Sequence, residues 1–539
     1  MTQAPWWRDA VIYQIYPRSF SDADGDGYGD IPGIIARLDH VKDLGVDAIW
    51  CSPFYASPMK DAGYDVSDYQ SIDPLFGTLA DAEALVEACH ARGLKLIVDL
   101  VPNHTSSQHA WFKAALAAAP GSPERAMYHF ADGRGEHGEL PPNNWTSIFG
   151  GKGWTRLVDA DGNPEQWYLH LFDVTQPDLN WDDERVRQGF DDILRFWLDR
   201  GVDGFRVDVA HSLVKAPGLP DDDADYRMIA GGQGPMWDQD GVHDIYRRWR
   251  RILDEYSGER ILVAEAWVDV PERLALYLRP DEMHTAFNFR FLASEWDADA
   301  YRECITHSLD ADEAVGAPTT WVLSNHDAMR HVSRLGRRER PGVHEAFIGP
   351  DDEQPDHALG LRRARAATMM ELSLPGSAYL YQGEELGLPD HTTLPHEYRQ
   401  DPAWFQSGHE EIGRDGCRIP LPWEADAPGL GFSPTGRTWL PQPGSYRALA
   451  VDAQSGVEGS TLELYRRWLR LRRDLGLGQG TLTWRDDFGD GVLAYENAGV
   501  LVIVNVSGAP LPLPADREVL TSSEPLGATL PKDAAVWLR

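Results

Sequence analysis

The stretch Leu94–Ser106, LKLIVDLVPNHTS, decides the fold, because a largely apolar run passes directly into polar residues. An apolar run as short as Leu94–Leu100 suits a strand of a parallel sheet that is buried on both faces. The pattern Ala80–Arg92 before it is helical, and similar pairs of helix and apolar run recur along the chain. The predicted strands are Val11–Tyr16, Val46–Trp50, Leu94–Leu100, Gly204–Val209, Ile261–Glu265, Thr285–Phe289, Thr320–Ser324 and Ser377–Tyr381. Eight such segments joined by helices predict an α/β fold, the (β/α)8 TIM barrel.

The alternation breaks in two places and ends before the C-terminus. Residues 105–174, rich in Gly, Pro, Asn and Trp, are too long for a structureless loop, so we expect an inserted subdomain after the third strand. Residues 387–450 are a second irregular stretch, expected as a subdomain after the eighth strand. The barrel then comprises residues 1–104 and 175–478. Residues 479–539 alternate in the manner of strands and predict a small antiparallel β domain.

Composition excludes some partners. Fifty basic and 85 acidic residues give a formal charge of −35, which repels a polyanion such as nucleic acid. The N-terminus has no basic segment leading into an apolar one, and no stretch approaches the ~20 apolar residues of a membrane span. We therefore expect a cytoplasmic protein without membrane contact. Cys51, Cys89, Cys304 and Cys417 form no CxxC pair, which favours reduced thiols. The oligomeric state stays open.

Polar residues stand where four of the apolar runs end. They are Asp99, Asn103, His104, Arg206, Asp208, Glu265, His326 and Asp327. The carboxyl ends of barrel strands meet at one mouth, so several carboxylates should share a pocket, which like-charge repulsion makes costly unless they have a function. Glycoside hydrolysis needs such a set: one carboxylate as nucleophile and one protonated carboxyl as acid. Asp208 and Glu265, on adjacent strands, can reach the ~5–5.5 Å separation of retaining enzymes. Arg206 should keep Asp208 ionised.

These segments resemble the sequence blocks of the α-amylase superfamily of glycoside hydrolases. Gln176–Trp181 (QPDLNW) resembles a block typical of its oligo-1,6-glucosidase and α-glucosidase branch. Trp6–Phe20, Gly63–Tyr69 (GYDVSDY) and Tyr381–Gly387 (YQGEELG) are similar to that branch as well, and the likeness runs from residue 6 to about 475. The resemblance implies that Asp208 is the nucleophile, Glu265 the acid/base and Asp327 the transition-state stabiliser.

The resemblance also implies a blind pocket for one terminal glucose. Its substrate-binding residues would be Asp61, Tyr64, His104, Phe149, Phe172, Gln176, Arg206, His326 and Arg418. An ion pair of Asp61 with Arg418 would close the pocket behind the sugar and enforce exo action. One departure is visible: Arg418–Trp423 reads RIPLPW where the branch has an RTPMQW-like run, so the neighbouring backbone can differ.

The loop Asp22–Asp30, DADGDGYGD, offers carboxylates at alternate positions, with glycines for tight turns. This pattern is typical of hard-cation sites, although the closing Glu of a twelve-residue calcium loop is replaced by Gly33. In the resembled branch the loop holds a structural Ca²⁺ or Mg²⁺. The implied ligands are Asp22, Asp24, Asp26 and Asp30 with the carbonyl of Tyr28. We expect no organic cofactor.

The expected function is that of an exo-acting retaining α-glucosidase on short oligosaccharides. Alternatives are a sucrose- or trehalose-type isomerase or transglucosidase, an endo-amylase, and a non-catalytic relative. Two features bear on linkage. Val209 after the nucleophile accompanies α-1,6 preference in the branch, whereas a long connection, about Leu213–His243, goes with α-1,4 activity and could cover the mouth. We weigh Val209 slightly higher. Trp267 would offer a stacking face to the leaving sugar.

Overall fold

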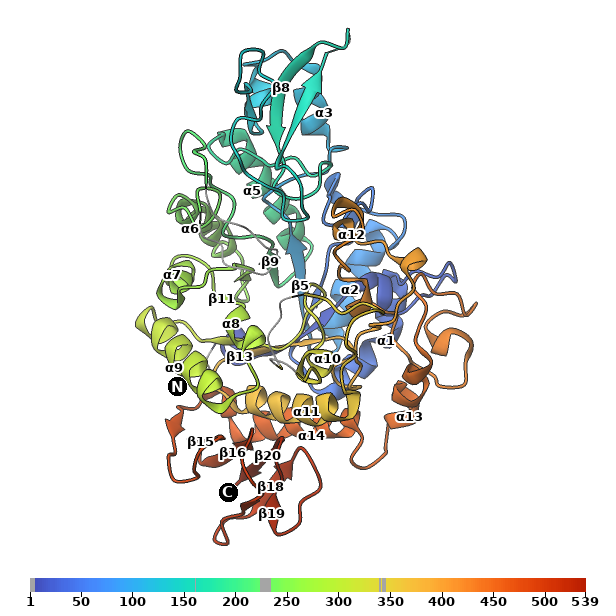
Figure 1. Ribbon diagram of the computed structural model, residues 1–539, viewed down its shortest axis with the longest axis vertical. Coiled ribbons are helices and arrows are strands. Elements are labelled where there is room, and N and C mark those ends of the chain that lie inside the picture. The colour runs from blue at the N-terminus through green and yellow to red at the C-terminus, as the bar shows by residue number, and fades with distance from the viewer. Residues whose placement is uncertain (1–4, 160, 223–233, 339–340, 342–345) are drawn as a thin grey trace.

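The computed structural model describes residues 5–159, 161–222, 234–338, 341 and 346–539, and its centre is a barrel of parallel strands (Figure 1). The strands are β1 Val11–Ile15, β2 Ala48–Cys51, β5 Lys95–Leu100, β9 Gly204–Val207, β10 Ile261–Ala264, β11 Thr285–Ala286, β12 Thr320–Val322 and β13 Ser377–Tyr381. They pair in the order β11-β10-β9-β5-β2-β1-β13-β12, all parallel. Within the described residues no ladder joins β11 to β12, so the barrel is nearly closed. The predicted TIM barrel is confirmed.

The strand pleat divides the core into two layers. Ile12, Trp50, Ile97 and Val263 belong to one apolar cluster, which also includes Tyr379, whereas their immediate neighbours along the strands pack in a second, larger cluster with the helices. This alternation follows from the period of two in a strand and explains why the strand sequences are apolar throughout.

Helices surround the barrel. They are α1 Ile31–Leu44, α2 Leu79–Ala91, α5 Glu184–Asp199, α6 Val242–Leu253, α7 Pro271–Ala275, α8 Phe289–Ala293, α9 Ala298–Ala314, α10 His331–Leu335, α11 His357–Ser373 and α14 Thr461–Leu475. Capping sets several ends: Thr78 and Asp81 form a capping box at the start of α2, and α1 ends at Gly45 with a φ of 100°. The predicted sixth strand, Thr285–Phe289, is too long, because the Asn288 side chain accepts the Phe291 N–H at 3.0 Å and begins α8.

The segment between β5 and α5 carries its own small sheet, at the top of Figure 1. Its elements are α3 Ala110–Ala117, α4 Pro123–Ala126, β6 Phe130–Ala131, β7 Trp154–Val158 and β8 Pro164–Leu169, with the strands antiparallel in the order β6-β8-β7. A hairpin of β3 Tyr55–Ala56 and β4 Asp68–Ile72 follows β2.

The long connection after β9 can be followed only in part, since residues 223–233 of the predicted cover lie outside the described residues. Its described start packs on the inserted segment. The Trp145 indole N–H donates to the Pro220 carbonyl at 2.9 Å, and the Asn143 amide donates to the Leu219 carbonyl at 3.2 Å.

The C-terminal residues form a separate antiparallel sheet, as predicted. Its strands are β14 Thr483–Trp484, β15 Val492–Asn497, β16 Val500–Asn505, β18 Val519–Ser522 and β20 Ala534–Leu538, with β17 Leu511–Pro512 paired to β19 Thr529–Leu530. In Figure 1 α11 and α14 lie between the barrel and this sheet. The preceding irregular segment contains α12 Pro402–Gln406 and α13 Val451–Gln454. None of the described helices has the length and apolar character needed to cross a membrane.

Candidate active site

Arg206 organises the carboxylates at the carboxyl ends of β5, β9 and β10. Arg206 lies in register with Asp99 on β5, and its Nη1 is 2.9 Å from Asp99 Oδ1. The same nitrogen is 2.5 Å from Asp208 Oδ1, and Nη2 is 3.3 Å from Glu265 Oε2. All four side chains are buried. The two carboxylates predicted to perform the chemistry therefore contact one guanidinium.

Three carboxylates around one guanidinium leave negative charge in excess. Burial raises the pKa of Asp208 well above its ordinary value, and Glu265 and Asp99 add to this, although Arg206 opposes it. Burial likewise raises the pKa of Asp99, to about 6, against the pull of Arg206. Arg206 lowers the pKa of Asp208, as predicted, but it is shared with Asp99 and Glu265, and burial acts against it.

Glu265 is fixed at both oxygens. The backbone N–H of Val209 donates to Oε2 at 2.7 Å, and the indole N–H of Trp267 donates to Oε1 at 2.7 Å. Val209 has a φ of 44°, a conformation that β-branched residues rarely adopt and that costs of order 1–3 kcal/mol. In this strained turn the backbone N–H of Val209, the residue after the nucleophile Asp208, points toward Glu265.

His326 and Tyr64 form the next side of the site. Tyr64 Oη is 2.6 Å from His326 Nε2 and donates to Asp99 Oδ2 at 3.1 Å, and the two rings stack with centroids 5.3 Å apart. The amide of Gln14 lies 2.6 Å from His326 Nδ1. With that amide donating, Nε2 carries the hydrogen. Burial lowers the pKa of His326 well below its ordinary value, against the pull of Asp327.

Asp327 is held by two arginines. Arg414 Nη1 lies 2.9 Å and Arg418 Nη2 lies 2.8 Å from Asp327 Oδ1. Burial alone would raise the pKa of Asp327, but His326, Arg414 and Arg418 hold it below its ordinary value. Asp327 is thus an anion in the site.

The predicted ion pair of Asp61 with Arg418 is wrong. Arg418 contacts Asp327 and the carbonyl of His326, the latter at 2.8 Å from Nε. Asp61 pairs instead with Arg414, whose Nη2 lies 2.8 Å from Asp61 Oδ1. Arg414 also binds Asp401 through Nε at 2.6 Å. The cation paired with Asp61 is therefore an arginine four residues earlier in the chain than the predicted one.

Asp401 anchors this arginine. Burial would raise the pKa of Asp401, but Arg414 and Arg418 outweigh it and lower the pKa to about 2. Asp401 also accepts the Arg414 backbone N–H at 2.7 Å. Neither Arg414 nor Asp401 was predicted. The available signal was an arginine within the same short run as Arg418, GRDGCR.

The inserted segment supplies the pocket wall. Gln176 Nε2 lies 3.1 Å from Asp61 Oδ2 and 3.1 Å from His104 Nε2. The rings of His104 and Phe172 lie 5.0 Å apart, and Phe172 meets Phe149 edge-on at 5.8 Å. The Arg414 guanidinium lies over the Phe149 ring at 5.2 Å. These contacts connect five of the predicted pocket residues with one another and with Arg414.

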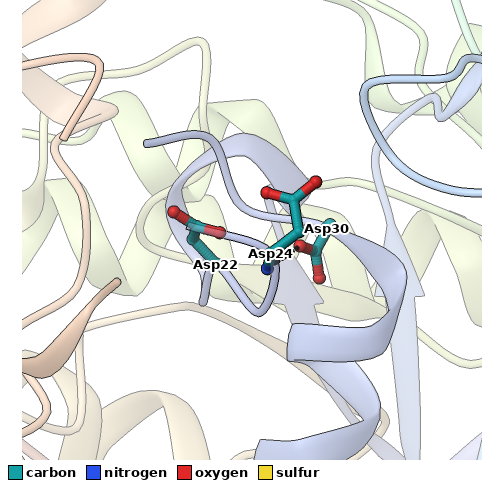
Figure 2. Close-up of side chains that lie close together, drawn as sticks. All are labelled: Asp22, Asp24 and Asp30. Carbon is teal, nitrogen blue, oxygen red and sulfur yellow. Dashed lines mark hydrogen bonds between the residues drawn. The ribbon is translucent and has the colours of Figure 1, made fainter. Parts of the chain in front are cut away.

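The loop before α1 gathers three carboxylates. Ligand oxygens of Asp22, Asp24 and Asp30 lie within 4.8 Å of one another, and Figure 2 shows these side chains together on the loop. Asp26 is not in this cluster, and its carboxylate accepts the Tyr28 N–H at 2.8 Å. An all-oxygen, all-carboxylate donor set fits a hard cation such as Ca²⁺ or Mg²⁺.

The same loop supports the irregular segment that carries the pocket floor. The Asp22 N–H donates to the Phe432 carbonyl at 2.9 Å, and the Trp439 N–H donates to the Gly27 carbonyl at 2.9 Å. The rings of Tyr28 and Trp439 stack with centroids 6.2 Å apart. A cation bound here would stabilise that junction.

Known proteins share this organisation. The sequence profile of the α-amylase catalytic domain matches residues 14–478. A probable α-glucosidase of Rhizobium meliloti is 37% identical over 93% of this chain and 89% of its own length. An oligo-1,6-glucosidase of Parageobacillus thermoglucosidasius is 36% identical over 87% of this chain and 84% of its own length. The crystal structure of an α-glucosyl transfer enzyme, XgtA, superposes with a TM-score of 0.86 at 38% identity, covering 99% of both chains. The chain belongs to the α-amylase family of glycoside hydrolases.

Proposed function

We propose that this protein is an exo-acting, retaining α-glucosidase that releases α-glucose from the non-reducing end of short α-glucosides. One observation carries the proposal: Asp208 and Glu265 contact the same guanidinium, and Arg414 joins Asp61 to Asp327 beside them. Charged groups that block the far end of a pocket admit a terminal sugar and exclude an internal one. The glucosidase names of the relatives support the same substrate class.

The geometry supports a double displacement. A carboxylate oxygen of Asp208 attacks the anomeric carbon, the bond from that carbon to the glycosidic oxygen breaks, and its electron pair leaves with the oxygen. That oxygen takes the proton of Glu265. In the second step the Glu265 carboxylate removes a proton from water, the water oxygen attacks the anomeric carbon, and the bond to Asp208 breaks with its electrons returning to the carboxylate. Two inversions give α-glucose.

Two measurements test the mechanism. Asp208→Asn should abolish turnover of a natural disaccharide, whereas Asp269→Asn, which changes an exposed carboxylate on the loop after β10, should stay close to wild type. Proton NMR of the first product should show the α anomer. A fully active Asp208→Asn protein free of wild type, or initial release of the β anomer, contradicts the proposal. Internal fragments from a maltooligosaccharide would contradict exo action.

Transfer to an acceptor sugar is the second candidate. The glycosyl intermediate on Asp208 can be captured by a sugar hydroxyl instead of water, and the similarity to an α-glucosyl transfer enzyme favours this outcome. Chromatography of products from maltose, isomaltose, sucrose, trehalose and p-nitrophenyl α-glucoside separates hydrolysis, transfer and isomerisation. New trisaccharides from maltose or isomaltose at high substrate concentration would establish transfer, whereas a new disaccharide from sucrose or trehalose would indicate isomerisation.

We propose a slight preference for α-1,6 over α-1,4 linkages, based on Val209. Val209 packs in one apolar cluster with Met236 and Trp237 from the long connection after β9. The two features that bear on linkage therefore share one apolar cluster and should not act independently. Discrimination through one side chain is worth ~1–3 kcal/mol. The test is the ratio of kcat/KM on isomaltose to kcat/KM on maltose, measured in wild type and in Val209→Thr. If maltose is preferred and the substitution leaves this ratio unchanged, the long connection after β9, and not Val209, determines the linkage preference.

A structural cation completes the proposal. Asp22, Asp24 and Asp30 would hold Ca²⁺ or Mg²⁺, and its role would be to stabilise the loop. The catalytic carboxylates lie at the ends of β9 and β10, so no step of the chemistry runs through this ion.

A further inference from the structure

Trp267 makes two contacts that its predicted stacking role does not include. Its indole ring stacks on Phe289, with ring centroids 3.7 Å apart and planes 4° from parallel. One face is thus covered by the protein, and the indole N–H donates to Glu265 Oε1 at 2.7 Å. Stacking a leaving sugar was the expected role, yet the polar end of this side chain is directed at the acid/base.

The two oxygens of Glu265 are not equivalent. Oε2 accepts the Val209 N–H at 2.7 Å and lies 3.3 Å from Arg206 Nη2. In a protonated carboxyl group, the oxygen that faces two donors, one of them cationic, is the carbonyl oxygen, which only accepts. The acidic proton therefore belongs on Oε1, the oxygen contacted by Trp267.

We infer that Trp267 is a positioning residue that holds Oε1 of Glu265 as the proton-donating oxygen and stabilises the charge left on it when the proton moves to the glycosidic oxygen. This inference rests on the proposed function. A protonated oxygen is a weak acceptor and a carboxylate oxygen a strong one, so the indole bond strengthens as the proton leaves. Interactions that strengthen toward the transition state raise the rate.

Neighbouring contacts make the indole a rigid donor. Phe289 begins α8, the helix capped by Asn288, so the stacking partner of Trp267 sits on a fixed element. A ring clamped in this way keeps its N–H aimed without an entropy cost at the moment of reaction. Phe289 acts on Glu265 only through Trp267.

The test removes the N–H and keeps the ring. Trp267→Phe should lower kcat/KM for a natural disaccharide about ten- to a hundredfold, the effect of a hydrogen bond to a charged group. For α-glucosyl fluoride, whose leaving group needs little protonation, the loss should stay below about threefold. The alkaline limb of the kcat/KM profile should move up by roughly one pH unit, because the charged acid loses a donor.

Two further variants separate positioning from folding. Phe289→Leu keeps the N–H but loosens its clamp, and should show the same pattern at a smaller size. Trp7→Phe changes a tryptophan that packs edge-on against His284, and should leave both substrates and the profile unchanged. Equal losses on disaccharide and fluoride with an unmoved alkaline limb would overturn the inference and leave Trp267 a structural residue.

The outcome is distinguishable from failure of the proposed function. If the wild type turns over no α-glucoside, or Asp208→Asn stays active, the proposed function fails before Trp267 is tested. If those controls behave as proposed and Trp267→Phe shows no selective loss, only the positioning role fails.

Discussion

The ion pair of Asp61 with Arg414 offers a sharp test of the pocket floor. The two groups are 2.8 Å apart and both are buried, so the bond between them is charge-assisted and shielded from water. Such a bond is worth about 1.5–3 kcal/mol, which corresponds to roughly a ten- to 150-fold change. Asp61→Asn should therefore lower kcat/KM on maltose or isomaltose by about this factor.

A double-mutant cycle assigns the partner. In Asp61→Asn combined with Arg414→Ala, the joint loss should fall short of the product of the single losses by about the same ten- to 150-fold factor. Combined with Arg418→Ala, the losses should multiply, since Arg418 contacts Asp327 and the His326 carbonyl. Arg418→Ala alone should still lower kcat/KM about ten- to a hundredfold, through Asp327. Steady-state kinetics on the five variants measures both couplings.

Folding needs a control in this cycle. Arg414→Ala leaves Asp401 buried without its cation, which costs about 3–5 kcal/mol of stability. The double variant Arg414→Ala/Asp401→Asn also lacks the Asp401 charge, so its Tm should be higher than that of Arg414→Ala and closer to that of the wild type. The same cycle can then be measured in proteins that carry Asp401→Asn. If the losses from Asp61→Asn and Arg414→Ala simply multiply there, while those from Asp61→Asn and Arg418→Ala do not, the pairing of Asp61 with Arg414 is wrong.

Two further predictions concern stability. Chelation with EDTA should lower the Tm of the wild type and leave the Tm of Asp22→Ala unchanged, because the variant lacks one carboxylate of the proposed cation site. Equal changes of Tm in both proteins would contradict a cation site at Asp22. Burial raises the pKa of Asp312 from 3.8 to about 7, so the folded state favours its protonated form and stability falls as pH rises from about 4 to 7. Asp312→Asn, which still accepts the Thr319 hydroxyl, should match wild type in Tm at pH 4 and exceed it at pH 8, and a difference independent of pH would contradict this.

The barrel could be predicted because its strands are buried on both faces. A strand buried on both faces requires a short run of apolar residues, and polar residues follow at the carboxyl end of each run. Asp208, Glu265 and Asp327 were candidates by their position at strand ends, whereas their roles were implied by the family resemblance. The sixth strand was overestimated because Phe287 and Phe289 suit a strand or a short helix equally, and only the Asn288 cap distinguishes them.

The pocket floor could not be predicted in the same way. Arg414 lies in an irregular segment without periodicity, so no local pattern says which of two nearby arginines reaches Asp61. The full set of partners of Arg206 could not be predicted for a related reason: the structure shows that it contacts Asp99 and Glu265 as well as Asp208. Ion-pair partners depend on tertiary geometry, which sequence spacing does not contain.

The partners in the floor are separated by 353 residues, and this orders events during synthesis of the chain. At about 5–20 residues per second, Arg414 is made roughly 20–70 s after Asp61. During that interval the apolar strands can already pair, whereas Asp61 must remain hydrated or form an ion pair with a different cation. The catalytic pocket is therefore completed late, after most of the barrel has been translated. A ribosome-stalled chain that ends before residue 414 could have much of the barrel and still lack a floor.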